Sequence, residues 1–148
     1  MFWRALVAFL VLPGTIAYLV PLIVLMPNEA LSIHLIGLGP LILGTILLLE
    51  CVREFYVSGK GTLAPWAPPR SLVVTGAYRY SRNPMYIAVG LVLSGWALTF
   101  RSAGLAVYAI VVALGFHVRV VLGEEPWLAR THGEQWLQYK ASVPRWLF

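Results

Sequence analysis

The chain has 148 residues, of which 59% are apolar and only 11% are charged, and its formal net charge is +5. A soluble globular domain carries roughly 25% charged residues, so this composition excludes an ordinary soluble fold and indicates that the bilayer is the main solvent. Cys51 is the single cysteine, which excludes an internal disulfide and a zinc site built from several cysteines.

The first two predicted elements are apolar runs long enough to cross a bilayer. Residues 5–27 carry no charged side chain, and residues 30–52 carry none before Glu50. About 20 apolar helical residues cross a hydrocarbon core. We therefore predict membrane spans over both ranges, with a kink in the first at Pro13 and Pro21. A cleaved signal peptide is the alternative for the first run, but the run exceeds the usual length of about 7–15 residues.

A long connection follows, which we predict to be a loop at residues 53–83. Its centre, residues 57–76, is rich in glycine and proline and has no regular period. Loops of about this length without secondary structure are usually functional or disordered. Trp66 and the run Leu72–Val74 argue against disorder, because a solvated linker seldom carries such side chains. An ordered loop at the membrane surface is expected.

Two shorter apolar runs predict a helical hairpin. We place the third and fourth spans at residues 84–100 and 102–122, with Arg101 at the turn between them. The uncharged runs within them, residues 84–100 and 102–118, are near the short limit for a membrane span. Four glycines in this hairpin are candidates for close approach between helices: Gly90, Gly95, Gly104 and Gly115.

Lysine and arginine segregate in this arrangement of four helices. Of the eleven in the chain, all except Arg101 lie in segments on one side. Positive side chains are retained on the cytoplasmic side of a membrane, so both termini and the long loop are expected there. We expect a multi-pass protein of a bacterial inner membrane. The positive charge then reflects topology, and no nucleic-acid partner is expected.

The C-terminal tail, residues 123–148, carries an apolar stripe with helical spacing. The stripe predicts one or two amphipathic helices at the cytoplasmic interface, broken near Gly133. Its members are Leu128, His132, Trp136, Tyr139 and Val143. The fold class expected from the whole sequence is all-α, with about four transmembrane helices and this interfacial tail.

Ionisable side chains suited to catalysis gather at two places in the sequence. Arg79 and Arg82 precede the third span, and Glu124 and Glu125 follow the fourth. Because the two helices of a hairpin run antiparallel, Arg82 and Glu124 are expected on the same face of the membrane. These groups are therefore candidates for one site.

These residues belong to a pattern that resembles a known family. The stretch from Gly76 to Tyr86 reads GAYRYSRNPMY, the pair Glu124–Glu125 follows, and then come Gly133, Tyr139 and the run Val143–Arg145. The pattern is similar to the isoprenylcysteine carboxyl methyltransferases and phospholipid methyltransferases, which are integral membrane enzymes. The resemblance covers about residues 53–148, whereas the first two spans match only as apolar helices.

The resemblance implies S-adenosyl-L-methionine as the methyl donor. Carried onto this chain, the cofactor-binding residues are Ser71, Leu72, Val73, Tyr78, Asn83, Pro84, Met85, Tyr86 and Glu124. Many relatives have histidine where Asn83 stands. We assign catalytic roles to Arg82, Glu124 and Glu125 and substrate contacts to Arg119 and Gly90.

The chemistry of the donor suits these residues. We expect Glu124 to accept hydrogen bonds from the ammonium or ribose of the donor, with Arg82 or Arg79 near its carboxylate. The alternative is that Glu124 forms an interfacial ion pair with Arg119. A Rossmann crevice is excluded because no Gly-x-Gly-x-x-Gly follows a strand.

The acceptor is expected to be lipophilic and to enter from the membrane lipids, as an isoprenylcysteine-type carboxylate or a similar molecule. One competing interpretation is an NADPH-dependent membrane reductase of the sterol-reductase type, which has a similar Arg-x-Pro-x-Tyr pattern. The other is a non-enzymatic membrane scaffold or transporter. The sequence does not specify an oligomeric state.

Overall fold

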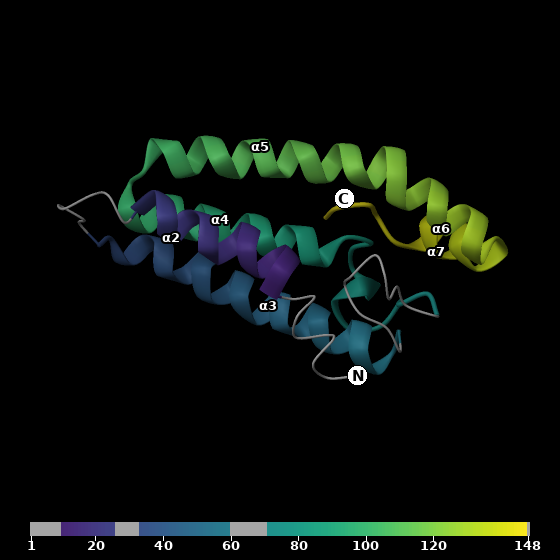
Figure 1. The fold of residues 1–148 in the computed structure, drawn as a ribbon. Coiled ribbons are helices and arrows are strands. Elements are labelled where there is room, and N and C mark those ends of the chain that lie inside the picture. The colour runs from purple at the N-terminus through teal and green to yellow at the C-terminus, as the bar shows by residue number, and fades with distance from the viewer. Residues whose placement is uncertain (1–9, 26–32, 60–70, 148) are drawn as a thin grey trace.

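The computed structural model describes residues 10–25, 33–59 and 71–147. All regular elements in these ranges are helical, so the predicted all-α class is confirmed for the described residues. In chain order they are η1 (Leu10–Leu19), α2 (Val20–Leu25), η2 (Leu35–Gly37), α3 (Leu38–Val57), η3 (Gly76–Arg79), α4 (Pro84–Phe100), α5 (Ala103–Arg119), η4 (Val120–Glu124), α6 (Glu125–His132) and α7 (Glu134–Ser142). Figure 1 shows α3, α4 and α5 lying lengthwise, with α6, α7 and the C-terminal segment gathered at one end.

Two continuous helices in the described ranges are long and apolar enough to cross a membrane. They are Leu35–Val57 and Ala103–His132, whereas Pro13–Leu25 and Pro84–Phe100 are apolar but shorter. The second predicted span continues to Val57 as α3, so the predicted loop begins within a helix. The starts of the first two predicted spans and the loop centre around Trp66 lie outside the described residues.

The first helix changes type where prolines interrupt it. The segment Leu10–Leu19, which contains Pro13, is a π-helix, and α2 continues from Val20 as an α-helix. Pro21 has no N–H to donate, so carbonyl groups one turn earlier need other partners.

Side chains of neighbouring helices provide those partners. Trp96 Nε1 of α4 donates to the carbonyl of Ala17 at 3.0 Å, and the Tyr108 hydroxyl of α5 donates to that of Ile16 at 3.1 Å. These bonds satisfy the carbonyl groups near Pro21 and hold the first helix against the bundle, and the predicted kink stays a prediction.

Glycines bring α3 and α4 into close contact. A Cβ at Gly44 of α3 would lie 2.8 Å from the Ala88 carbonyl oxygen, and one at Gly95 of α4 would lie 2.6 Å from the Leu41 nitrogen. Such distances leave no room for a side chain. A fully buried core is packed along this contact and comprises Ala17, Leu48, Ala88, Val89, Val92 and Leu93.

The prediction that four glycines pack the hairpin was right only for Gly95, and its partner helix is α3 rather than α5. Nothing lies within 4 Å of a Cβ added at Gly90 or Gly115, and Gly104 meets only the Ser102 hydroxyl at 3.8 Å. These glycines were assigned by sequence position alone, and their helix faces are open in the folded chain.

The turn between α4 and α5 lies at the predicted residue. Arg101 adopts a left-handed backbone with φ of 47° and ends α4. The Ser102 hydroxyl then accepts a hydrogen bond from the Leu105 N–H at 3.3 Å and begins α5. The outer face of α5 exposes a row of large apolar side chains, as expected for contact with lipid: Val107, Ile110, Val111, Leu114 and Val118.

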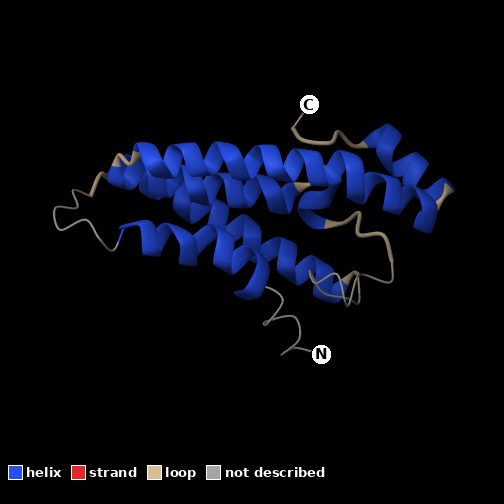
Figure 2. Ribbon diagram, turned by 45° about the horizontal axis from the view of Figure 1, so that its top comes forward, coloured by secondary structure: helices blue, strands red, loops and turns tan. Residues whose placement is uncertain are grey.

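Figure 2 shows the same bundle from a second direction. Beyond α5 the chain passes through the π-turn η4 into α6, and Gly133 separates α6 from α7 with φ of 49°. The predicted break at Gly133 is confirmed. The positive φ favours glycine because L side chains seldom adopt it.

Candidate functional site

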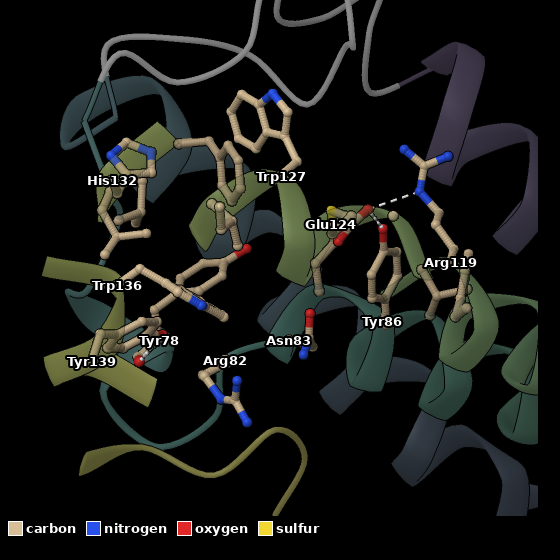
Figure 3. Close-up of a pocket in the computed structure, with 18 of the residues that line it drawn as sticks. Tyr78, Arg82, Asn83, Tyr86, Arg119, Glu124, Trp127, His132, Trp136 and Tyr139 are labelled. Carbon is tan, nitrogen blue, oxygen red and sulfur yellow. Dashed lines mark hydrogen bonds and ion pairs between the residues drawn. The ribbon is translucent and has the colours of Figure 1, made fainter. Parts of the chain in front are cut away.

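A cavity of about 810 Å³ lies at the end of the bundle where α6 and α7 pack. Residues far apart in the sequence line it: η1 and α3 contribute a few, and the segment before η3, the start of α4, the end of α5, and both tail helices contribute the rest. Figure 3 shows Tyr86, Arg119 and Glu124 on one side of the cavity and Tyr78, His132, Trp136 and Tyr139 on the other.

Most of the residues predicted to bind cofactor or substrate line this cavity. They are Ser71, Leu72, Val73, Tyr78, Arg82, Asn83, Met85, Tyr86, Arg119 and Glu124. Pro84 is not among the lining residues, because it is buried as the first residue of α4, where its missing N–H costs nothing. Gly90, Glu125 and Arg79 also lie outside the lining.

Glu124 is the centre of a small polar cluster in the cavity wall. Its Oε1 accepts hydrogen bonds from the Tyr86 hydroxyl and, at 2.8 Å, from Nε of Arg119. The Tyr86 ring stacks on Phe116 with 4.2 Å between ring centroids. The ion pair between Glu124 and Arg119, which the sequence left as an alternative, is therefore present.

A π-turn sets the geometry of this cluster. Arg119 and Glu124 are five residues apart, and in a regular α-helix only residues three or four apart are neighbours. In η4 the Glu125 N–H donates to the Val120 carbonyl, which is the five-residue bond of a π-helix. This turn brings Arg119 and Glu124 onto one side, and π-turns are frequent at functional sites.

The adjacent carboxylate, Glu125, has a different environment from the one predicted. It is buried and binds two arginines: Nη1 of Arg82 at 2.8 Å, and both Nε and Nη2 of Arg145 at 2.8 and 2.9 Å. Hydrogen bonding to Glu125 raises the pKa of Arg145. Glu125 therefore does not line the cavity, because its carboxylate lies between Arg82 and Arg145, and its catalytic role stays a prediction.

Arg82, one of the two arginines bound to Glu125, also lines the cavity. Its guanidinium carbon lies 5.3 Å from the ring centroid of Trp136, and its side chain is only 8% exposed. Its Nε is buried and has no hydrogen-bond partner among the described residues. A buried donor without a partner is costly, so a ligand acceptor would be favourable at this position.

The C-terminal segment is built into the site. The backbone N–H of Arg82 donates to the Pro144 carbonyl at 2.9 Å, and the Asn83 side-chain amide donates to the Arg145 carbonyl at 3.0 Å. The Tyr139 hydroxyl donates to the Tyr78 carbonyl at 2.7 Å. These bonds hold the loop before α4 against the tail.

The apolar stripe of the tail faces the protein. Trp136 and Tyr139 are buried, and Leu128 and His132 join them in the cavity lining. The expectation that this stripe lies on the membrane interface is therefore corrected for these residues. Burial raises the pKa of Tyr78 and of Tyr139, in the latter case against the opposing charge of Arg82, so both hydroxyls stay protonated near neutral pH.

Several lining residues were not predicted as site residues. They are Pro13, Ile16, Phe55, Val89, Phe116, Val118, Leu122, Gly123, Trp127, Leu128, His132, Trp136 and Tyr139. The helical stripe of the tail was the available signal for four of them, but its period does not say what the stripe packs against. Apolar residues in a membrane helix carry no comparable signal.

The ends of the long loop are tied to α3. The buried carboxylate of Glu54 accepts hydrogen bonds from the hydroxyls of Ser58 and Thr75 at 2.8 and 2.5 Å. The exposed Arg53 pairs with Glu54 at 3.7 Å. From Thr75 the chain continues through Tyr78 and Arg82 into the site.

A comparison with protein-family models matches residues 32–135 to the phospholipid methyltransferases. The match begins earlier than the resemblance found in the sequence, since it includes α3, and it ends within α7. Neither the curated proteins nor the solved structures gave a match.

Proposed function

Because the chain belongs to the phospholipid methyltransferase family, we propose that it is an S-adenosylmethionine-dependent methyltransferase acting at the cytoplasmic face of the membrane on a lipophilic acceptor. Family membership by itself suggests a membrane methyltransferase. The donor, the acceptor class and the membrane side are the parts that we propose.

One observation carries the proposal: four separate segments of the predicted donor-binding pattern line a single cavity. They are the strip at Ser71–Val73, Tyr78, the start of α4 with Asn83, and Glu124. Ligand pockets usually measure about 300–1,000 Å³, and the cavity of about 810 Å³ lies in that range.

The charges of the wall fit the charges of the donor. Glu124 lines the cavity and can accept from an ammonium or from ribose hydroxyls, and Arg82, whose Nε has no hydrogen-bond partner among the described residues, would supply a positive charge near the donor's carboxylate. Aromatic walls from Trp127, Trp136 and Tyr78 suit an adenine ring and a sulfonium cation. Bound there, the donor would supply an electrophilic methyl group, and the chain would contribute alignment of the reacting atoms.

The acceptor is proposed to lie against the apolar part of the cavity lining. Ile16, Val89 and Phe116 form this apolar wall, and Arg119, which follows Phe116 by three residues on α5, has a side chain that is 56% exposed. An apolar tail would lie against this wall while an anionic group meets Arg119. An isoprenylcysteine-type carboxylate fits this arrangement. A carboxylate is already deprotonated at neutral pH, so no general base is required.

The topology is part of the same proposal. Four spans with both termini and the long loop in the cytoplasm would put the cavity where a water-soluble donor and a bilayer-dissolved acceptor can meet. The segregation of lysine and arginine supports this orientation. A cysteine-accessibility map with single cysteines at positions 101 and 140 tests it, because the two should be labelled from opposite sides.

The decisive experiment measures ligand-dependent thermal stability of the purified protein. S-adenosylhomocysteine at 100 times its dissociation constant should stabilise it by about 2.7 kcal/mol, whereas NADPH should have no effect. Stabilisation by NADPH alone would favour the reductase interpretation, and stabilisation by neither would favour a scaffold or transporter. Labelled S-adenosylmethionine incubated with a lipid and peptide extract would then identify the acceptor as the species that carries the label.

A further inference from the structure

The ion pair between Arg119 and Glu124 lies in one wall of the cavity, where the groups proposed for the two ligands meet. Glu124 is the proposed contact of the donor, and Arg119 is the proposed contact of the acceptor anion. Among the described residues, each forms its only salt bridge with the other. While the two residues are paired, Glu124 is not free to bind the donor and Arg119 is not free to bind the acceptor.

From this geometry we infer that the pair enforces an order of binding: the methyl donor takes Glu124 first, and the released Arg119 then binds the anionic group of the acceptor. The inference rests on the proposed function and adds to it a coupling between the two ligands. Arg119 acts here as a positioning and specificity residue that becomes available only when the donor is present.

The local structure suits an exchange of partners. The side chains of Glu124 and Arg119 are 31% and 56% exposed, and ion pairs this accessible contribute little to stability. Arg119 uses only Nε for Glu124. In Figure 3 its other two nitrogens point away from that carboxylate, so a single contact holds the guanidinium, and it can turn to an incoming anion once the donor has taken Glu124.

The two other arginines near the site do not replace Arg119 as a partner for the acceptor anion. Arg82 and Arg145 are both bound to Glu125, so they offer no equivalent free cation to the acceptor. The Tyr86 hydroxyl remains hydrogen-bonded to Glu124 and keeps that carboxylate oriented while Arg119 leaves. A bare Glu124 would also repel an acceptor anion, and the cationic group of the donor removes this repulsion.

The test measures the affinity of an anionic, lipophilic ligand with and without saturating S-adenosylhomocysteine. This compound has no sulfonium charge, so it cannot attract the anion through that group. N-acetyl-S-farnesylcysteine supplies a carboxylate, a short-chain phosphatidylethanolamine supplies a phosphodiester, and the methyl ester of the first is the uncharged control. Linkage makes the effect reciprocal, so the affinity for S-adenosylhomocysteine is measured in the same way with each ligand.

We expect at least about a fivefold gain in affinity for one of the two ligands that carry an anionic group, at the lower end of usual coupling energies, and none for the methyl ester. The ligand that shows the gain tells whether the anionic group of the acceptor is a carboxylate or a phosphodiester. Equal affinity with and without S-adenosylhomocysteine for both anions would overturn the inference. If the wild-type protein fails to bind S-adenosylhomocysteine, the proposed function itself fails.

An Arg119→Gln variant gives a second test, through the direction in which the affinity for S-adenosylhomocysteine changes. Removing a competitor for Glu124 should leave the affinity for S-adenosylhomocysteine unchanged or higher, while the coupling to the anion disappears. A tenfold loss of donor-side affinity would instead mean that Arg119 contacts the donor, which contradicts the inference. Arg130→Gln is the matched control, because Arg130 is exposed on α6 and only donates to the Pro126 carbonyl. The wild-type measurement remains decisive if Arg119→Gln folds poorly.

Discussion

Glu124 and Glu125 are adjacent in the sequence, but their carboxylates bind different partners in different surroundings. Glu124 lies in the cavity wall with Tyr86 and Arg119, whereas Glu125 is buried between Arg82 and Arg145. A pair that looks like one motif therefore has two environments, one in the cavity wall and one inside the fold.

Glu125→Gln should destabilise the protein. The substitution leaves two arginines without their carboxylate, and removing one partner of a fully buried pair costs about 3–5 kcal/mol. Because the Arg145 side chain is 33% exposed, we expect a smaller loss of about 2 kcal/mol. Thermal unfolding in detergent measures it, and a loss below about 0.5 kcal/mol would contradict the structural role.

Glu124→Gln should weaken donor binding and leave the stability of the protein nearly unchanged. Its partners are half-exposed or neutral, so stability should change by less than about 1 kcal/mol. Affinity for S-adenosylhomocysteine should fall by about tenfold or more, since a charge-assisted hydrogen bond is lost. Isothermal titration gives the answer, and unchanged affinity would remove Glu124 from the donor site.

Gly95→Val should separate α3 from α4. The new side chain would begin 2.6 Å from the Leu41 backbone nitrogen, which cannot move without moving α3. Overpacking of this kind typically costs about 1–3 kcal/mol. Gly115→Ala is the control, because its Cβ meets nothing within 4 Å, and it should be neutral or slightly stabilising in the same unfolding assay. Equal tolerance of both substitutions would argue against the close contact.

Tyr139→Phe should loosen the tail from the loop before α4. It deletes the hydroxyl that donates to the Tyr78 carbonyl at 2.7 Å, and a lost hydrogen bond with a buried partner costs about 1–3 kcal/mol. Donor affinity should fall as well, because Tyr78 and Tyr139 both line the cavity. Tyr80→Phe is the matched control, since Tyr80 is 76% exposed. Indistinguishable unfolding temperatures of the two variants would show that the tail is not held by this bond.

The features that the sequence predicted correctly are properties of short segments. The turn at Arg101, the break at Gly133 and the all-helical character follow from local residue chemistry, since a charged residue ends an apolar run and glycine permits a positive φ. The gathering of Asn83, Tyr86 and Glu124 was also predictable, because the two helices of a hairpin return to the same end. The number of membrane spans and the membrane side remain predictions.

The sequence by itself determined that this chain is apolar enough for a bilayer, helical, and equipped with the residues of a methyltransferase family. Only the tertiary structure decided which way those residues face. The π-turn at Val120–Glu124 rotates Glu124 toward the cavity and Glu125 away from it, and the packing of α7 turns Trp136 and Tyr139 inward. Sequence period specifies that a helix has an apolar face, but the free energy of burying that face depends on what the rest of the chain places opposite it.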